Sequence, residues 1–212
     1  MRTVIFANGE LPDPQDIPSM LRPDDLILAA DGGGEHCLAL DITPAAVIGD
    51  FDSLTKADLA KLEYLGAEII RRPARKDETD LELALLLALE RGASEALVLA
   101  ALGARWDQSL ANLLLPAHPE LHGLDLTFVH GSQRIYPINS QRTISGQPGD
   151  TLSLIPIGGH ARGVTTSGLE YPLNNETLYL GATRGISNTI TATEASITVE
   201  DGQLLCVHIS TS

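Results

Sequence analysis

Two acidic residues separated by one position follow an apolar run of the chain. The run 45–48 indicates a buried strand. Alternate side chains of an extended chain point to the same side, so Asp50 and Asp52 should face one way and Phe51 the other. Carboxylates this close repel each other, and a hard divalent cation such as Mg²⁺, which prefers oxygen ligands, removes the repulsion. The simpler alternative for this motif alone is a solvated turn in which Asp52 or Ser53 caps the next helix.

Acidic residues also follow other predicted strands. We expect strands at 4–7, 26–30, 45–48, 67–70, 96–100 and 124–129, and helices at 35–40, 55–65, 80–91 and 109–115. This alternation favours an α/β fold, a Rossmann-like parallel sheet with helices on both faces. Such sheets bind ligands beyond the carboxyl ends of their strands. Four strands should therefore bring acids to one edge, namely Asp31, Asp50, Asp52, Asp77 and Asp107. Each acid alone could cap a helix, but together they favour a site for Mg²⁺ and a polyphosphate.

Two local motifs support a phosphate-binding edge. The run Asp31–Gly34 follows the second predicted strand, and its glycines allow a ligand to approach the backbone closely. Thr79-Asp80-Leu81-Glu82 has the pattern of a capping box, which predicts that a helix begins at Asp80. The helix should end before Gly92.

The pattern of the chain changes after about residue 137. Helical periodicity gives way to short β-type runs at 150–155, 163–166, 177–180, 195–199 and 204–209. Turn signals at Pro148-Gly149, Gly158-Gly159 and Asp201-Gly202 separate them. We therefore expect two domains, an α/β domain over residues 1–135 and an all-β sandwich or barrel over residues 136–212.

Composition limits the possible partners and the compartment. The chain of 212 residues carries a formal net charge of −14, which repels nucleic-acid backbones. No apolar run reaches the roughly 18 residues of a membrane span. Cys37 and Cys206 lie far apart in apolar surroundings, as expected of reduced core thiols, and the N-terminal run lacks a secretory pattern. We expect a cytoplasmic protein that binds neither nucleic acid nor membrane.

Several motifs, taken in order along nearly the whole chain, resemble those of the thiamine pyrophosphokinase family. In the first domain these are Asp31-Gly32-Gly33, Gly49-Asp50-Phe51-Asp52-Ser53, Lys76-Asp77-Glu78-Thr79-Asp80 and the segment 102–108. In the second they are the segments 153–156, 166–173 and 186–188. Gly103-Ala104-Arg105 stands where the family usually has Gly-Gly-Arg, and Tyr171 stands where it often has Trp.

The resemblance implies transfer of the β,γ-pyrophosphoryl group of ATP to the hydroxyethyl oxygen of thiamine, with release of AMP. It implies catalytic acids at Asp50, Asp52, Asp77 and Asp107, and Mg²⁺ ligands at Asp31, Asp50, Asp52 and Asp77. The implied ATP-binding residues are Asn8, Gly9, Asp31, Gly32, Arg72, Lys76, Thr79, Asp80 and Arg105. Those for thiamine are Tyr171, Ser187 and Asn188. Asp77 and Asp107 are both open as the acceptor of the hydroxyl proton.

The resemblance also implies a homodimer in which the partner's β domain completes each site. Two other functions are compatible with the ATP-binding motifs. One is a pterin diphosphokinase, which would share the ATP half and differ in the acceptor. The other is a catalytically silent module that binds nucleotide for regulation. Loss of a single acid would not harm the fold of a silent module, so the intact set of acids favours an enzyme.

Overall fold

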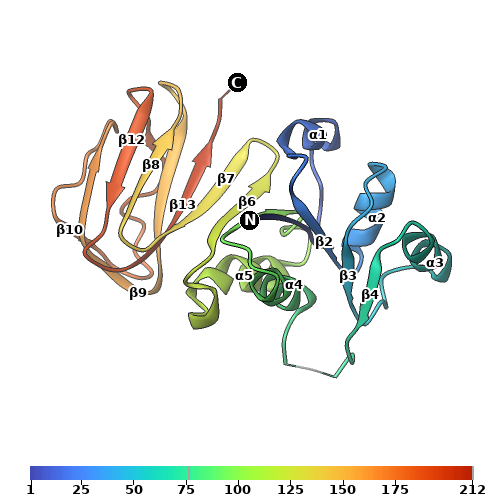
Figure 1. Cartoon of the computed structure of the whole chain (residues 1–212). Helices are drawn as coiled ribbons and strands as arrows, with labels where there is room; N and C mark the ends of the chain where they lie inside the picture. The colour runs from blue at the N-terminus through green and yellow to red at the C-terminus, as the bar shows by residue number, and fades with distance from the viewer. Residues whose placement is uncertain (76, 212) are drawn as a thin grey trace. The chain divides into compact units, whose positions relative to one another are not determined.

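The computed structural model describes residues 1–75 and 77–211, and the chain forms two compact units, Met1–Gly131 and Ser132–Ser212. The first unit contains a parallel sheet in the order β4-β3-β2-β1-β5-β6 (Figure 1). Its strands are β1 (Arg2–Phe6), β2 (Leu26–Ala30), β3 (Ala46–Gly49), β4 (Glu68–Arg71), β5 (Glu95–Leu99) and β6 (Asp125–His130). Its α-helices are α1 (Ile17–Met20), α2 (Gly33–Ala39), α3 (Lys56–Tyr64), α4 (Asp80–Glu90) and α5 (Trp106–Leu114).

Helices cover both faces of this sheet, as predicted. Val4 of β1 and Val47 of β3 share a buried cluster with Cys37 of α2 and Leu62 of α3. The helix α4 instead packs against β1, β2 and β3 from the other face, where its apolar side chains are buried. Strand alternation sends successive residues to opposite faces, so one sheet supplies both cores.

The chain before β2 and after α5 contains short helical turns. These are the 3₁₀ turns η1 (Pro14–Asp16), η2 (Leu115–Ala117) and η3 (Pro119–Leu121). Pro12, Pro14 and Pro18 disfavour regular structure in this segment, but η1 and α1 occupy it. Proline is well tolerated in the first turn of a helix, which explains the difference. None of the described helices is long and apolar enough to cross a membrane.

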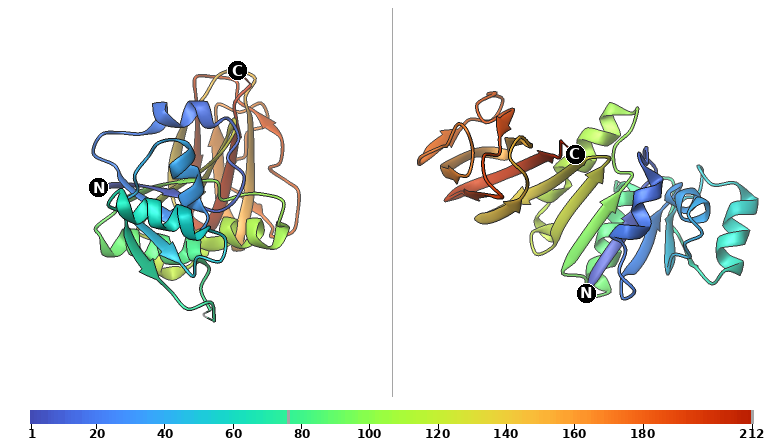
Figure 2. Two further views of the ribbon diagram at one scale, coloured as in Figure 1. Left: turned by 90° about the vertical axis from the view of Figure 1, so that its right-hand side faces the viewer. Right: turned by 90° about the horizontal axis from the view of Figure 1, so that it is seen from above.

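The second unit is an antiparallel β-sandwich, which confirms the predicted fold class. Its strands are β7 (Gln133–Ile138), β8 (Gln141–Ser145), β9 (Thr151–Ser167), β10 (Glu176–Leu178), β11 (Asn188–Thr189), β12 (Glu194–Thr198) and β13 (Asp201–Ile209). The first part of β9 pairs with β13 and β11, whereas its later part pairs with β12 and β10. Figure 2 shows the strands of this unit, coloured from yellow to red, in two further views. One strand therefore belongs to both layers around the buried cluster of this unit.

The continuous strand β9 corrects one prediction. We expected two strands with a turn at Gly158-Gly159, but a single strand runs from Thr151 to Ser167. Gly158 (φ 72°) and Gly163 (φ 64°) adopt left-handed conformations, and the register against β13 shifts near them. Such irregularities bend a strand without ending it. The predicted break before the last strand exists, but it lies at residues 199–200, so Asp201 and Gly202 are the first residues of β13.

Candidate functional site

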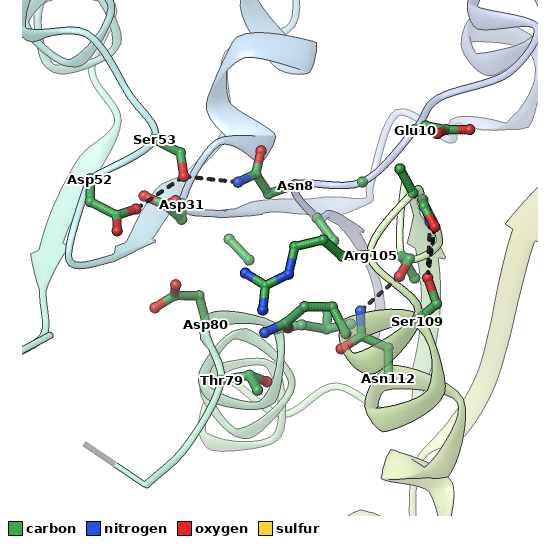
Figure 3. A pocket seen from close by; sticks show the side chains of 18 of the residues that line it. Asn8, Glu10, Asp31, Asp52, Ser53, Thr79, Asp80, Arg105, Ser109 and Asn112 are labelled. Carbon is green, nitrogen blue, oxygen red and sulfur yellow. Dashed lines mark hydrogen bonds between the residues drawn. The ribbon is translucent and has the colours of Figure 1, made fainter. Parts of the chain in front are cut away.

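A pocket of about 490 Å³ lies at the carboxyl ends of β1, β2, β3 and β5 in the first unit (Figure 3). This volume is in the range of small-molecule binding sites. Its polar lining residues are Asn8, Glu10, Asp31, Asp50, Asp52, Ser53, Thr79, Asp80, Arg105, Gln108, Ser109 and Asn112. The edge of the sheet predicted to collect acids therefore carries a cavity lined by four aspartates.

Three of these aspartates are close enough to share one cation. One carboxylate oxygen of each of Asp31, Asp50 and Asp52 lies within 4.8 Å of the others. Asp31 is only 3% exposed, and its Oδ1 atom is buried without a hydrogen-bond partner among the described residues. Burial, with smaller contributions from the negative charges of Asp80 and Asp52, raises the pKa of Asp31. A bound cation would give Oδ1 of Asp31 a partner and would reduce the repulsion between the carboxylates.

The turn after β3 positions the Asp50–Asp52 pair as predicted. Phe51 is buried in the core with φ 64°, and the guanidinium of Arg71 lies 5.0 Å from the centre of its ring. The amide of Asp52 donates to Oδ1 of Asp50 at 3.1 Å. Because Phe51 points into the core, both neighbouring carboxylates can line the pocket.

The loop after β1 closes one side of the cluster. Asn8 donates from Nδ2 to Oγ of Ser53 at 2.9 Å, and Ser53 donates in turn to Oδ1 of Asp52 at 3.0 Å. A Cβ atom on Gly32 would lie 2.0 Å from Oδ1 of Asn8, so a side chain at position 32 would displace the Asn8 amide from this arrangement. This network fixes the Asp52 carboxylate relative to the strand end.

Thr79 and Asp80 reach the pocket from the start of α4. The Thr79 side chain accepts from the amide of Glu82 at 3.2 Å, which confirms the predicted helix cap. Asp80 is the first residue of the helix and lies on the side of the pocket opposite Asn8. A well-capped helix start therefore holds the fourth aspartate of the pocket in place.

Arg105 supplies positive charge to this acidic pocket. Its guanidinium reaches into the space between Asp80 and Asn8 (Figure 3). It also donates to Asp107 from Nη2 at 2.6 Å and from Nε at 3.2 Å. This contact lowers the pKa of Asp107. Asp107 is therefore held ionised beside a residue of the pocket.

The pocket does not include every predicted site residue. Asn8, Gly9, Asp31, Asp50, Asp52, Thr79, Asp80 and Arg105 line it, whereas Gly32, Arg72, Asp77 and Asp107 do not. Gly32 adjoins Asp31, Asp107 is bonded to Arg105, and Asp77 is exposed to solvent. Lys76 lies outside the described residues.

Sequence reasoning missed a polar wall formed by the loop after β5 and by α5. The hydroxyl of Ser109 bonds both the amide and the carbonyl of Gly103, at 3.1 Å each. Asn112 donates from Nδ2 to the carbonyl oxygen of Ala101 at 2.7 Å. The spacing of three between Ser109 and Asn112 on one helix, just after a strand, was the available signal.

The predicted thiamine-binding residues lie in the second unit. Tyr171 is exposed, and the side-chain amide of Asn188 bonds the main chain of Tyr171. Ser187 has φ 56°, and its amide donates to Oγ of Ser153 at 3.0 Å. The buried side chain of Asn188 therefore links the segment of Ser187 to that of Tyr171, and both of these residues are exposed.

Comparison with protein families gives one match for each unit. Residues 17–128 match the model described as the thiamin pyrophosphokinase catalytic domain. Residues 138–204 match the vitamin B1 binding domain of thiamin pyrophosphokinase. The second match is to a domain named for thiamine, which weighs against a pterin acceptor.

Curated relatives and solved structures agree with these matches. The chain is 27% identical to thiamine pyrophosphokinase of Bacillus subtilis, covering 98% of this chain and 99% of the relative. It is 30% identical to thiamine pyrophosphokinase 1 of Arabidopsis thaliana, over 95% and 84% of the two chains. The crystal structure of the Bacillus subtilis protein superposes with a TM-score of 0.89 and 25% identity, covering 100% of both chains.

Proposed function

Because the chain belongs to the thiamin pyrophosphokinase family, we propose that its acidic pocket binds ATP for transfer of pyrophosphate to thiamine. The observation that carries this assignment is the cluster of Asp31, Asp50 and Asp52 at the carboxyl edge of the parallel sheet. An acidic pocket repels a polyphosphate unless a cation accompanies it. The expected cation is Mg²⁺.

The residues present fit this cation. They offer three carboxylates, which are hard oxygen donors, and one of them has a buried oxygen without a partner. We propose Asp31, Asp50 and Asp52 as ligands, with Asp80 in place of Asp77 as the further acid near the polyphosphate, because Asp80 lines the pocket. When bound, Mg²⁺ supplies charge neutralisation of the polyphosphate oxygens.

In the proposed reaction, the hydroxyethyl oxygen of thiamine attacks the β-phosphorus of ATP. A bond forms between these two atoms, and the bond from the β-phosphorus to the oxygen bridging the α- and β-phosphates breaks. AMP leaves with that oxygen, and the hydroxyl proton passes to a base or to water. Arg105 is placed to stabilise charge on the transferring phosphates, because its guanidinium points into the pocket.

Neither Asp77 nor Asp107 is favoured as the proton acceptor. Asp77 does not line the pocket, and the pairing of Asp107 with Arg105 lowers the pKa of Asp107, which weakens it as a base. Phosphoryl transfer passes through a loose transition state that depends mainly on positioning and electrostatics. We therefore assign the catalytic contribution of this chain to charge and geometry more than to one strong base.

We further propose that thiamine binds at the surface around Tyr171 and Ser187, contributed by the partner of a homodimer. An aromatic face at Tyr171 suits the thiazolium cation. On the first unit, α5 exposes Trp106, Leu110 and Leu114, which are spaced by four on the helix that also lines the pocket. An exposed apolar stripe beside an active site fits contact with a second copy of the chain.

Both thiols are free and buried, Cys37 in the first unit and Cys206 in the second. Burial raises the pKa of each to about 12, so neither is a reactive thiolate at neutral pH. Inert, unpaired thiols fit a reducing compartment, and we propose a cytoplasmic location.

Product analysis after incubation with ATP, Mg²⁺ and thiamine tests the proposed reaction. AMP and thiamine diphosphate should appear in equal amounts, and chelation of the metal should stop their formation. ADP with thiamine monophosphate would contradict pyrophosphoryl transfer. Absence of any thiamine-dependent product would contradict thiamine as the acceptor, and pterins would then be tested in its place.

A further inference from the structure

One side chain of the pocket has a hydrogen-bonding group that the protein does not use. Asn112 on α5 is 7% exposed and lines the pocket. Its Oδ1 atom is buried and has no hydrogen-bond partner among the described residues. A buried amide oxygen without a donor is costly, so a ligand that brings a donor to it gains affinity.

The orientation of this amide is fixed by the strand beside it. Nδ2 of Asn112 donates to the carbonyl oxygen of Ala101 at 2.7 Å. Reversing the amide would place two oxygen acceptors against each other, so Oδ1 is the atom left without a partner. Ser109, one turn earlier, is already bonded to both the amide and the carbonyl of Gly103. Asn112 is therefore the residue of this wall whose side-chain acceptor is buried and unpaired.

The position of Asn112 indicates which part of a nucleotide it meets. The aspartate cluster follows β2 and β3, whereas Ala101 and Asn112 belong to the segment that follows β5, on the far side of β1. Two to three strand spacings separate these sites, roughly 10–15 Å. Figure 3 shows Asn112 and Asp31 on opposite sides of the pocket, with Arg105 reaching between them. If the phosphates lie at the aspartates, the base is the part of the nucleotide that lies farthest from them.

We propose that Asn112 selects the nucleotide by accepting a hydrogen bond from the exocyclic 6-amino group of adenine. This inference rests on the proposed ATP-binding role of the pocket. A 6-oxo purine would place its own acceptor against Oδ1, and a purine without a 6-substituent would leave Oδ1 unpaired. Either base should therefore be used less well than adenine.

The test compares ATP with purine riboside 5′-triphosphate, which differs from ATP only by lacking the 6-amino group. The wild-type protein should prefer ATP by about tenfold or more in kcat/KM, as expected for an unpaired buried acceptor. Asn112→Ala should reduce this preference to near unity. Ser109→Ala is the matched control on the same helix, and it should affect both nucleotides by the same factor. An unchanged preference in Asn112→Ala would overturn the inference.

Two further measurements test whether another ligand group, and not the 6-amino group, donates the hydrogen bond to Asn112. A loss with 2′-deoxyATP that disappears in Asn112→Ala, while the loss with purine riboside triphosphate remains, would place a ribose hydroxyl at Asn112 and overturn the base contact. A rise in the KM of thiamine, with the nucleotide preference unchanged in Asn112→Ala, would place the aminopyrimidine there and overturn it equally.

Calorimetric binding of AMP and purine riboside 5′-monophosphate tests the base contact without turnover. Tighter binding of AMP by about tenfold or more, abolished in Asn112→Ala, supports the contact. Equal affinities in the wild-type protein would overturn it even if thiamine diphosphate forms. Conversely, a preference for AMP in a protein that forms no thiamine diphosphate would contradict the proposed reaction and retain the base contact.

Discussion

Asn188 holds the main chain of Tyr171 from both sides. The amide of Tyr171 donates to Oδ1 of Asn188 at 3.1 Å, and Nδ2 of Asn188 donates to the carbonyl oxygen of Tyr171 at 2.8 Å. Oδ1 also accepts from the amide of Thr189 at 2.9 Å. These bonds engage both ends of the Asn188 amide, so we propose that Asn188 positions Tyr171 and does not itself recognise thiamine.

Asn188→Ala should therefore weaken thiamine binding through Tyr171. We expect the KM for thiamine to rise while kcat changes less, together with a destabilisation of about 1–3 kcal/mol from the unpaired main-chain groups. Tyr171→Ala should raise the thiamine Kd by the equivalent of about 0.5–2 kcal/mol without comparable loss of stability. Thiamine titrations and thermal unfolding measure both effects. An unchanged titration in Tyr171→Ala would place Tyr171 outside the site.

Asp52→Asn should abolish turnover because it removes one carboxylate of the proposed metal site. The melting temperature should stay within a few degrees, since Asp52 is exposed and close to other negative charges. Glu63→Gln, on the exposed side of α3, is the control for a lost surface charge. Asp77→Asn should reduce activity much less than Asp52→Asn, and the opposite order would return the metal role to Asp77.

Asp31→Asn should weaken metal binding without lowering the stability of the metal-free protein. Burial raises the pKa of Asp31, so its ionised form is unfavourable in the folded protein at neutral pH. A neutral amide removes this penalty, and we expect a melting temperature equal to or above that of the wild type without metal. Added Mg²⁺ or Mn²⁺ should stabilise the wild type and not the variant. Equal stabilisation of both proteins would exclude Asp31 as a ligand.

Asp150 should make the stability of the second unit fall at acidic pH. It is buried and accepts bonds from the amides of Gln147 and Thr211 and from His208, which lower its pKa. Because the folded-state pKa lies below the unfolded value, this contribution is present above about pH 4 and is lost as the pH falls toward the folded-state pKa. Asp150→Asn should flatten the loss of stability in this range, and Asp150→Ala should cost about 1–3 kcal/mol at pH 7. Unfolding curves measured from pH 7 to pH 3 test this prediction. It would be refuted if the stability of Asp150→Asn changed with pH as steeply as that of the wild type.

Leu110→Glu should disrupt the proposed homodimer. Leu110 lies between Trp106, which is 84% exposed, and Leu114 on the apolar stripe of α5. A charge there should convert dimer to monomer in sedimentation experiments and reduce activity, with little change in melting temperature. Tyr64→Glu places a charge on an exposed position of α3 (90% exposed, against 59% for Leu110) and should leave the dimer intact. A Leu110→Glu protein that remains dimeric would move the interface elsewhere.

The main features of the pocket could be predicted from the sequence because they depend on local periodicity. The strand that ends before Asp50 fixes which side Phe51 faces, and the capping box at Thr79 fixes where α4 begins. Asp77 and Asp80 are only three residues apart, and both follow the same strand. Which of them reaches the pocket depends on the path of the intervening loop, which no local pattern specifies.

Other features depended on partners distant in the sequence. Asn112 resembles any polar residue of an amphipathic helix until the carbonyl of Ala101 fixes its orientation. Gly158-Gly159 is an ordinary turn signal, but pairing with β13, about 45 residues later, on both sides of the two glycines keeps the strand continuous. Such long-range pairing overrides local preference, which explains why β9 was predicted as two strands.

The membership of β9 in both layers of the sandwich also affects the order of folding during synthesis. Its first part pairs with β13, which is translated last of the strands in this unit. Until residues 201–209 leave the ribosome, one edge of Thr151–Ile157 has no partner strand, whereas the parallel sheet of the first unit is already complete in sequence. A nascent chain at this stage would expose an unpaired, partly apolar edge to other chains. Slow translation or truncation just before β13 should therefore promote aggregation through the second unit.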